Sequence, residues 1–445
     1  MAMRSTFWLL IYFSTISPSF AQGPIIQSID KFLSPYVTTD NFYGTVYVAR
    51  SGKVIYEKSF GKANVEWNVL NVNHTGYHLA SVSKPFTSTA ILLLEQEGKL
   101  STADPVSKYL PDFNRGKEIT IHHLLCHTSG VANINDFPEY NLLSVTPISL
   151  DSIVKVFQKR PLLFEPGAKF SYSNSNYNVL AYIIEKVSGM KYGEFLKKNI
   201  FTKLGMKNTV HDGDPRTIIE NVASGYAPVG KTSLQRAPFF LWSIKTGNGS
   251  LCSTVEDLAL FDRALYDEQL LGKSAKDKMF TPNLSDVGYG WFLKPHNNHK
   301  RSYITGRSPG FSTYFGRYTD DQVCVIVLSN LYIPTTKEIG EGLAAILFNE
   351  SFTQRMLGDE PLSEEQGKQF TGTYQFGTDF FRPDFNMEIN WVEGHLNCSF
   401  GELIRDTKDG FILRSFWSSI LFERDGEKIT GLSFDGVKAK RIKPR

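Results

Sequence analysis

The sequence is poor in cysteine, with four among 445 residues, and its charges nearly balance, with 48 Lys and Arg against 45 Asp and Glu. Four cysteines are too few for a disulfide framework in a chain of this length, so we expect most of them to be buried and unpaired. Because no run of like charges occurs, nucleic acid and anionic membrane surfaces are not expected partners. No segment after residue 21 has about 18 consecutive apolar residues, so no membrane span is expected there.

The N-terminus has the pattern of a secretory signal peptide. An apolar stretch, FWLLIYF at 7–13, follows Arg4 and precedes the small residues of Ser19-Phe20-Ala21. This arrangement predicts a signal peptide at 1–21 that is cleaved after Ala21, the alternative being a buried N-terminal strand. No cysteine stands at the cleavage point, so a lipid anchor is not expected. We therefore expect an exported protein, periplasmic or extracellular, that is soluble after cleavage.

Strand and helix patterns divide the rest of the chain. Alternating β-forming residues at 42–60 flank the turn Arg50-Ser51-Gly52-Lys53 and predict a β-hairpin. Apolar residues at helical spacing predict helices, and a β-rich segment returns later. In order, these are helices at 85–98, 176–188 and 254–266, strands within 303–330, and a last helix at 336–349. Strands on both sides of a helical middle predict an α+β domain whose sheet both chain ends complete.

The last 80 residues have a different sequence pattern. From residue 366 short β-rich runs alternate with turns such as Asp409-Gly410 and Asp425-Gly426, which predicts a small all-β barrel or sandwich at 366–445. The polar stretch LGDEPLSEE, 357–365, is the expected linker, so the main domain would occupy 22–356. The sequence does not indicate a partner for the C-terminal β domain.

One candidate nucleophile is Ser308, in Gly306-Arg307-Ser308-Pro309-Gly310, which fits the G-x-S-x-G nucleophile elbow. In an elbow, the backbone N–H of the residue after the serine forms half of the oxyanion hole. That residue is Pro309, which has no N–H. We therefore interpret Ser308 as a turn residue before Pro-Gly.

A second candidate is Ser81, in Ser81-Val82-Ser83-Lys84. The pattern S-x-x-K occurs five times in the chain, so spacing alone is weak evidence. Here it stands at the start of a strongly apolar helix, where the two side chains share one face and the positive helix end favours an oxyanion. By contrast, Ser188 follows the end of a helix and Ser59 lies in or just after a strand. Burial would lower the pKa of Lys84, as a proton acceptor requires. The alternative is a surface serine and lysine at a helix start.

Tyr172-Ser173-Asn174 is a third element, and Tyr-x-Asn occurs once among the 20 tyrosines. A tyrosine beside a lysine ammonium can become a phenolate and act as a general base. The Asn174 amide offers groups that could hold a substrate carbonyl. Taken alone, the segment is better explained as a polar loop.

Six segments stand together in an order that resembles a known superfamily. They are ASVSK (80–84), HTSG (127–130), YSNSNY (172–177), GSLCSTVEDLALF (249–261), YGW (289–291) and TGRSPGF (305–311). Together they resemble the serine β-lactamases and penicillin-binding proteins, especially the class C β-lactamase and esterase branch, over residues 40 to 350. The resemblance implies an antiparallel sheet flanked by helices. The C-terminal domain resembles the lipocalin-like barrels that often follow this fold.

The resemblance also implies roles for residues at matching positions. Ser81 would be the acylated nucleophile, Lys84 its proton partner and Tyr172 the base, while Asn174 would bind the substrate. Ile304-Thr305-Gly306-Arg307 would be the strand that lines the site, with the N–H groups of Ser81 and Arg307 as the oxyanion hole. No metal or organic cofactor is implied.

Ile304 departs from the family pattern, which usually has lysine or histidine at this position. Without that cation, we expect the pKa of Tyr172 to fall less and activity to shift to higher pH. The site also lacks the group that commonly receives a substrate carboxylate, which lowers the expectation of efficient β-lactam hydrolysis. Arg307 could supply the charge, but the sequence does not give its direction.

These observations predict an exported serine hydrolase that acts through an acyl-enzyme on a small-molecule or peptide substrate. A D-amino-acid peptide, a β-lactam and a small ester all remain open. The alternative is a penicillin-binding or sensing module that keeps the fold without turnover. His123 and His127 have the i, i+4 spacing of zinc ligands, but a third ligand and a glutamate base are missing, so we interpret them as structural. The loop at 131–147 could shape the substrate entrance.

Overall fold

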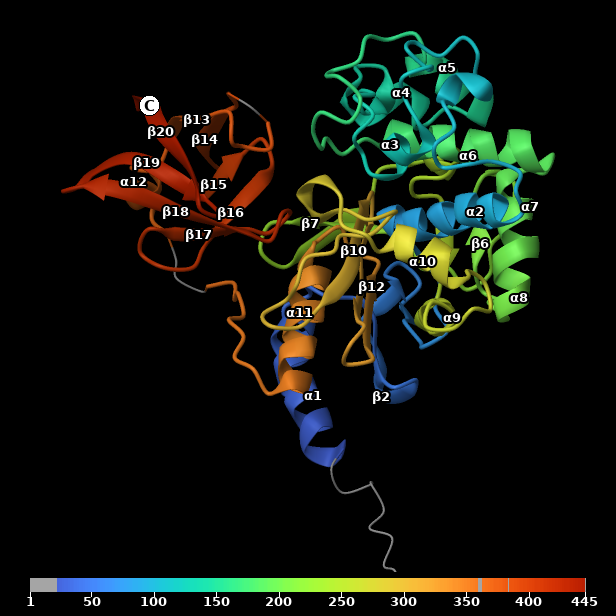
Figure 1. The fold of residues 1–445 in the computed structure, drawn as a ribbon. Coiled ribbons are helices and arrows are strands. Elements are labelled where there is room, and N and C mark those ends of the chain that lie inside the picture. Colours follow the sequence, from blue (N-terminus) through green and yellow to red (C-terminus); the bar gives the residue numbers. More distant parts are fainter. Residues whose placement is uncertain (1–21, 359–361, 383, 445) are drawn as a thin grey trace, which may run out of the picture.

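The computed structural model describes residues 22–358, 362–382 and 384–444, so the predicted signal peptide lies outside the described residues. An antiparallel sheet with two long helices on one face lies below a group of helices, and a β-barrel stands beside them (Figure 1). This arrangement confirms the predicted α+β class with a C-terminal all-β barrel. The domain limits themselves stay predictions.

The central sheet has five strands in the order β10-β11-β12-β1-β2, and all neighbours are antiparallel. The strands are β1 (Gly44–Arg50), β2 (Lys53–Phe60), β10 (Arg301–Ser308), β11 (Phe311–Tyr318) and β12 (Val323–Ser329). The predicted hairpin is β1 and β2, with Ser51 and Gly52 at positive φ in its turn. Because β1 pairs with β12, both ends of this part of the chain meet in one sheet, as expected.

Two helices cover one face of this sheet, α1 (Gln22–Thr38) and α11 (Thr335–Phe348) (Figure 1). The inward side chains of β1 and β12 are valines, such as Val46 and Val325, which are fully buried against the helices. The Tyr36 hydroxyl donates to Glu338 at 2.7 Å and ties the helices together. Helix α1 was not predicted from the sequence, and Pro35 lies inside it.

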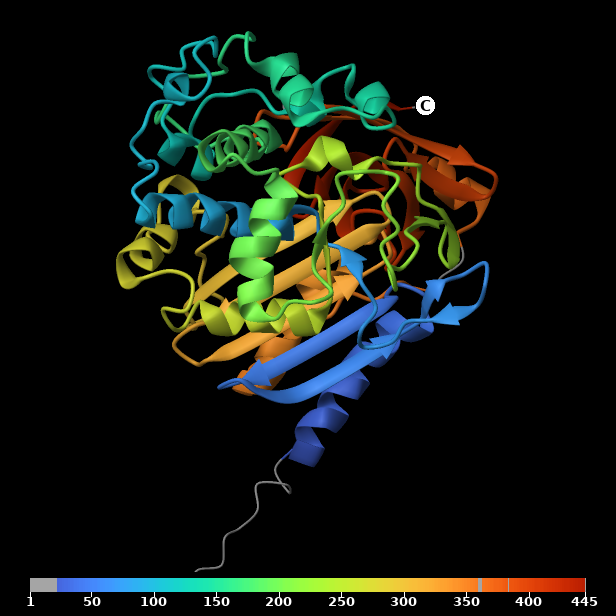
Figure 2. The same cartoon turned by 90° about the vertical axis from the view of Figure 1, so that its right-hand side faces the viewer.

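The helices that carry the candidate residues lie on the opposite face (Figure 2). They are α2 (Lys84–Gln96), α6 (Asn174–Ser188) and α9 (Val255–Ala264), which match the predicted helices to within two residues. Pro85 stands in the first turn of α2, as predicted, and every residue from Lys84 to Leu94 is buried. A helix that is buried on all sides is the core of this layer.

Shorter elements complete this part of the chain. The helices and 3-10 turns are η2 (Ala80–Ser83), η3 (Val106–Lys108), α3 (Ile121–Leu125), η4 (Ile134–Asp136), α4 (Tyr140–Leu143), α5 (Leu150–Phe157), α7 (Tyr192–Leu196), α8 (Thr202–Leu204), η6 (Trp242–Lys245), α10 (Lys273–Met279) and η7 (Leu284–Asp286), with a π-turn, η5 (Lys197–Phe201). The short strands are β3 (Lys62–Asn64), β4 (Val69–Leu70), β5 (Tyr77–His78), β6 (Val210–His211), β7 (Tyr226–Val229), β8 (Ser233–Arg236) and β9 (Leu251–Ser253).

The C-terminal barrel is closed by eight strands in chain order. They are β13 (Gly372–Phe376), β14 (Asn386–Val392), β15 (His395–Cys398), β16 (Gly401–Arg405), β17 (Gly410–Leu413), β18 (Ser418–Asp425), β19 (Lys428–Phe434) and β20 (Val437–Pro444). A short helix, α12 (Glu364–Lys368), precedes it and begins inside the expected linker. Phenylalanine side chains dominate the barrel interior.

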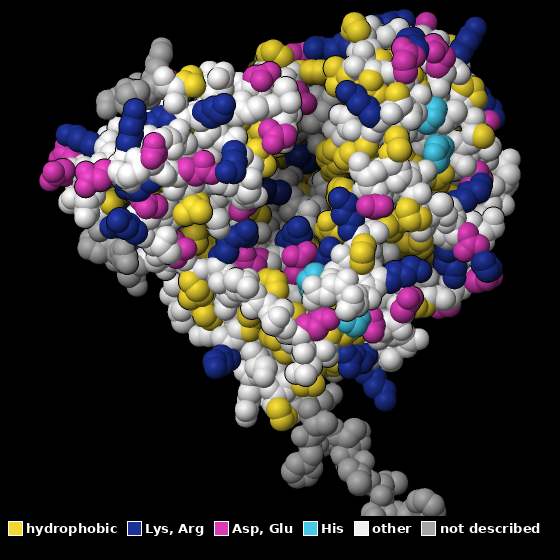
Figure 3. Space-filling view, turned by 60° about the vertical axis from the view of Figure 1, so that its left-hand side comes forward, with side chains coloured by type: hydrophobic (Ala, Val, Ile, Leu, Met, Phe, Trp, Pro, Cys, Tyr) yellow, Lys and Arg dark blue, Asp and Glu magenta, His cyan; other side chains and the backbone are white. Residues whose placement is uncertain are grey.

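The barrel contacts the rest of the chain through its β17–β18 connection. The Arg414 guanidinium donates to Asn41 Oδ1 at 2.7 Å and to the Asp40 carbonyl at 2.8 Å. Trp417 packs near Tyr36 of α1, with ring centroids 6.0 Å apart. A hollow opens between the barrel and the helical part, with basic side chains inside it and apolar side chains on its rim (Figure 3).

The four cysteines are unpaired, as predicted, and Cys126, Cys252 and Cys324 are buried. Within the described ranges, no helix combines the length and apolar character needed to cross a bilayer.

Candidate active site

Ser81 lies in the 3-10 turn that leads directly into α2, where the sequence predicted a helix start. Ala80, just before it, is buried and has a φ of 49°, in the left-handed region that side chains rarely adopt. Such a conformation persists only where its surroundings hold it. Ser81 is therefore presented by a tightly constrained turn.

The Lys84 ammonium nitrogen connects three separate elements. It donates to Ser81 Oγ at 3.0 Å, to Asn174 Oδ1 of α6 at 2.9 Å and to the Asn248 carbonyl at 2.8 Å. The side chain is fully buried, and burial is the largest cause that lowers its pKa well below the usual value. Lys84 therefore has both the position and the lowered proton affinity that a base for Ser81 requires.

The Tyr172 hydroxyl lies 2.7 Å from Ser81 Oγ, so the structure brings Ser81, Lys84 and Tyr172 together. Burial raises the pKa of Tyr172 to about 12, although the hydrogen bond with Ser81 acts in the opposite direction. The sequence-based expectation of an accessible phenolate is wrong in direction, because desolvation penalises the charged form. Of these three residues, Lys84 is the one whose pKa is lowered.

Strand β10 passes directly beside the turn that holds Ser81. A Cβ on Gly306 would lie 2.2 Å from the Leu79 carbonyl oxygen and from Thr313 Oγ1, so only glycine fits there. Thr313 Oγ1 also donates to the Leu79 carbonyl at 2.8 Å. Gly306 thus lets strand β10 approach the turn that carries Ser81.

The side chains around Gly306 take different directions. Ile304 is 2% exposed and belongs to the large apolar core. Thr305, paired with Tyr314 in the sheet, is partly buried. Ser308 ends β10 in a strand-to-strand hairpin rather than a strand-to-helix turn, and its buried Oγ has no hydrogen-bond partner among the described residues. This position does not have the geometry of a nucleophile elbow.

The Arg307 side chain lies between the barrel and the segment that follows β12. Its guanidinium lies over the rings of Tyr332, at 4.0 Å, and Phe416, at 4.6 Å, and it donates to the Ser415 carbonyl at 2.5 Å. Its direction, which the sequence left open, is therefore toward the β17–β18 connection. This guanidinium is engaged in the contact between the two parts.

Three neighbours of these residues were not among the predicted site residues. The side-chain oxygen Oδ1 of Asn135 accepts a hydrogen bond from Asn174 Nδ2 at 2.7 Å, and the ring of His127 stacks on that of Tyr172. The Asn248 backbone carbonyl accepts from Lys84. The glycines at 247 and 249 hinted at a close backbone approach, and Asn135 lies in the loop expected at the entrance. His127 was interpreted only as structural.

The two histidines at i, i+4 have separate surroundings. His123 completes a capping box with Thr120 at the start of α3. Burial lowers the pKa of His127 well below its usual value, and Lys84 lowers it further. In the described part of the chain, no group of three or more His, Cys, Asp or Glu is placed to hold a metal ion.

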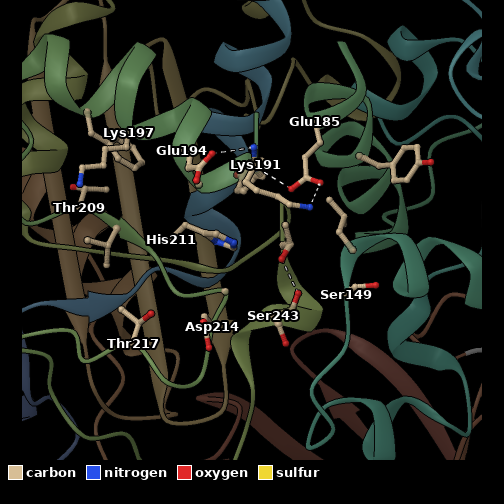
Figure 4. A pocket seen from close by; sticks show the side chains of 18 of the residues that line it. Ser149, Glu185, Lys191, Glu194, Lys197, Thr209, His211, Asp214, Thr217 and Ser243 are labelled. Atoms are coloured by element: carbon tan, nitrogen blue, oxygen red, sulfur yellow. Dashed lines mark hydrogen bonds and ion pairs between the residues drawn. The ribbon is translucent and has the colours of Figure 1, made fainter. Parts of the chain in front are cut away.

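A separate groove of about 1270 Å³ lies beside α6 and is bordered by α5, α7 and the segment 202–217 (Figure 4). His211 points into it, and Lys191 and Glu185 are paired at its edge. Ser81, Lys84 and Tyr172 do not line it. The groove is thus distinct from the candidate active site.

The fold matches that of penicillin-binding protein homologues. The structure aligns with an octameric penicillin-binding protein homologue from Pyrococcus abyssi, with a TM-score of 0.67 and 25% identity over 93% of this chain and 99% of that one. It also aligns with a D-stereospecific amidohydrolase from Streptomyces, with a TM-score of 0.60 and 25% identity over 68% and 94% of the two chains.

Sequence comparison gives the family. Residues 29–348 match the Beta-lactamase family, and this chain belongs to it. Penicillin-binding protein 4* of Bacillus subtilis is 36% identical over 337 residues, which cover 70% of this chain and 73% of that protein. The predicted resemblance is confirmed.

Proposed function

We propose that this protein is an exported serine hydrolase in which Ser81 forms an acyl-enzyme with an amide or ester substrate. One observation carries the proposal: a buried lysine amine with a lowered pKa lies 3.0 Å from Ser81 Oγ, while the Tyr172 hydroxyl lies 2.7 Å from the same atom. A nucleophile within hydrogen-bond reach of an activating base is the signature of covalent catalysis.

The pKa shifts favour one order of proton transfers. Neutral Lys84 accepts the Ser81 proton as Ser81 Oγ attacks the substrate carbonyl carbon. Tyr172 keeps its proton at neutral pH, because its pKa is about 12, and it is placed to donate to the leaving nitrogen or oxygen. The Lys84 ammonium then returns its proton to the Tyr172 phenolate, directly or through a water molecule, because Ser81 Oγ is now an ester oxygen without a proton. A second water molecule attacks the acyl carbon and releases the acid by the reverse transfers, and Ser81 Oγ recovers its proton.

Asn174 acts in this proposal as a positioning residue as much as a substrate contact. Its Oδ1 accepts from Lys84 and its Nδ2 donates to Asn135, so both ends of the amide are engaged. The Lys84 amine is thereby held in line with Ser81. The backbone N–H groups of Ser81 and Arg307 are proposed as the oxyanion hole, a function that needs no particular side chain.

The names of similar proteins, among them a D-stereospecific amidohydrolase and penicillin-binding proteins, support D-amino-acid amides and β-lactams as substrate classes. Small esters are the third class that we propose to compare. The buried Ile304 offers no cation to a substrate carboxylate. Uncharged esters and amides are accordingly the first substrates to test.

The test is intact-mass spectrometry of the mature protein mixed with benzylpenicillin or, separately, with the neutral ester p-nitrophenyl acetate. An adduct that maps to Ser81, decays with product release and is absent from Ser81→Ala is the expected result. Ser308→Ala is the matched control and should still form the adduct. An adduct that persists would indicate a binding or sensing protein, and one that survives in Ser81→Ala would overturn the assignment of Ser81.

A further inference from the structure

A second buried lysine, Lys245, lies beside the candidate site and has no role in the proton transfers proposed above. It ends the 3-10 turn η6, and its backbone carbonyl accepts from the N–H groups of Asn248 and Gly249 at 2.9 and 2.8 Å. The same short turn thus carries Lys245 and the Asn248 carbonyl that holds Lys84.

The Lys245 side chain lies against the nucleophile turn. A Cβ on Gly249 would be 3.2 Å from Lys245 Cδ and 3.4 Å from the Ala80 carbonyl carbon, so the lysine stem and Ala80 border the same glycine. Lys245 is 7% exposed, and its ammonium lies 5.2 Å from the centre of the Phe240 ring. Ala80 immediately precedes Ser81, so this side chain runs close to the reacting groups.

No carboxylate pairs with the Lys245 ammonium among the residues that the structure describes, although buried charges are usually paired. Instead, the Lys245 ammonium lies over the aromatic face of Phe240. Lys245 is near enough to Lys84 for its charge to lower the pKa of the Lys84 amine. A buried charge without a carboxylate partner is costly.

The other titratable groups around the pair do not cancel this charge. Tyr172 and Tyr177 present their rings to the Lys84 ammonium at 4.9 and 5.4 Å, and the pKa of each phenol is raised. Burial keeps His127 neutral. His78, which stacks on Trp242, is paired with Asp212 at 2.9 Å, so that carboxylate already has a partner.

We propose, resting on the serine-hydrolase function above, that Lys245 is a positioning residue whose positive charge, held beside the turn that carries Ser81, keeps the Lys84 amine neutral. The charged side chain is on η6 rather than on strand β10. Lys245 does not itself exchange protons with Ser81 or with the substrate.

The direction of the effect follows from electrostatics. Burial lowers the pKa of Lys245 to about 8, so it carries its charge over the neutral range. While charged, it disfavours a proton on Lys84 and lowers the pKa of that amine. Removing the Lys245 charge therefore raises the pKa of Lys84, and Lys84 becomes neutral only at higher pH.

The experiment is the rate of Ser81 acylation by p-nitrophenyl acetate from pH 5.5 to 9.5 in wild type and Lys245→Met. The neutral ester separates effects on Lys84 from binding of a substrate carboxylate. The acid limb of the rate profile should move to higher pH by on the order of one unit, which is about tenfold in rate at a fixed pH on that limb. The two profiles should converge at high pH.

Two further variants sharpen the result. Lys245→Gln should give the same shift and replaces Lys245→Met if the latter lowers the thermal midpoint strongly. Lys117→Met removes an exposed charge far from η6 and should leave the profile unchanged.

An unchanged acid limb in folded Lys245→Met and Lys245→Gln would overturn the proposal. A loss seen only with benzylpenicillin, which carries a carboxylate, would also overturn it and make Lys245 a substrate contact. Failure of wild type to acylate with either reagent would instead contradict the serine-hydrolase function itself.

Discussion

The Tyr172 phenol lies face to face with the His127 imidazole, with ring centroids 4.4 Å apart and an interplanar angle of 29°. The stack fixes the ring independently of the hydroxyl, which points to Ser81 Oγ at 2.7 Å. Orientation and proton transfer therefore rest on different parts of one side chain. A substitution that removes only the hydroxyl separates the two.

Tyr172→Phe should keep the stack and lose the proton donor. We expect the acylation rate to fall by about 10²- to 10⁴-fold, the usual contribution of a positioned acid or base, with little change in the thermal midpoint. The measurement is the rate of adduct formation by intact mass. Tyr374→Phe, which loses one hydrogen bond to the Phe370 carbonyl inside the barrel, is the matched control and should acylate normally. A near-normal rate in Tyr172→Phe would remove Tyr172 from the mechanism.

Gly306→Ala should destabilise the protein. The new Cβ would lie 2.2 Å from the Leu79 carbonyl oxygen, so strand β10 and the nucleophile turn must move apart. We expect a loss of about 1–3 kcal/mol in the free energy of unfolding, together with slower acylation. Urea unfolding followed by fluorescence measures the first. Gly23→Ala, where no atom lies within 4 Å of the new Cβ, should unfold at the wild-type midpoint; equal midpoints for both variants would contradict the close approach.

The folded protein should lose stability as pH falls from about 7 toward 4. Burial lowers the pKa of His211 to about 4, and those of His78 and His127 also lie below the ordinary value. The unfolded chain binds protons on these imidazoles near pH 6.5, whereas the folded one does not. Their stabilising effect is thus complete above pH 6.5 and is lost as the pH falls.

Chemical unfolding at pH 7 and pH 5 measures this slope. His211 alone is expected to contribute on the order of 2–3 kcal/mol of the pH-dependent part. His211→Gln should flatten the slope, whereas His74→Gln, at an exposed position, should leave it as in wild type. A slope of opposite sign would show that other groups dominate.

Arg307→Ala should loosen the barrel without removing the nucleophile's chemistry. The guanidinium contacts Tyr332 and Phe416 and donates to the Ser415 carbonyl, while the backbone N–H proposed for the oxyanion hole is unaffected. We expect a loss of about 1–2 kcal/mol of stability and faster proteolysis between α11 and β13.

Limited trypsin digestion and intact-mass acylation measure the two effects of Arg307→Ala side by side. Arg216→Ala, with a side chain that is 88% exposed, is the control and should resemble wild type in both. If Arg307→Ala stayed as resistant as wild type but no longer acylated, the guanidinium would belong to the active site rather than to the barrel contact.

Much of the fold followed from local patterns. The hairpin β1–β2, the helices α2, α6, α9 and α11, and the late strands all have the periodicity that their burial requires. Helix α1 was not predicted, because its stability comes from packing on α11 and the sheet, which no local signal reveals. Pro35 is tolerated inside α1 in that packed setting.

The sequence by itself determined the chemical types at the candidate site, and Ser81 and Lys84 share a helix face because three residues separate them. Tertiary structure decided how those groups behave. Burial raises the pKa of Tyr172 and lowers that of Lys84, barrel residues capture Arg307, and η6 brings Lys245 to the site. Proton affinity and side-chain direction depend on desolvation and on contacts between residues far apart in the chain, and neither is encoded in the spacing of neighbours.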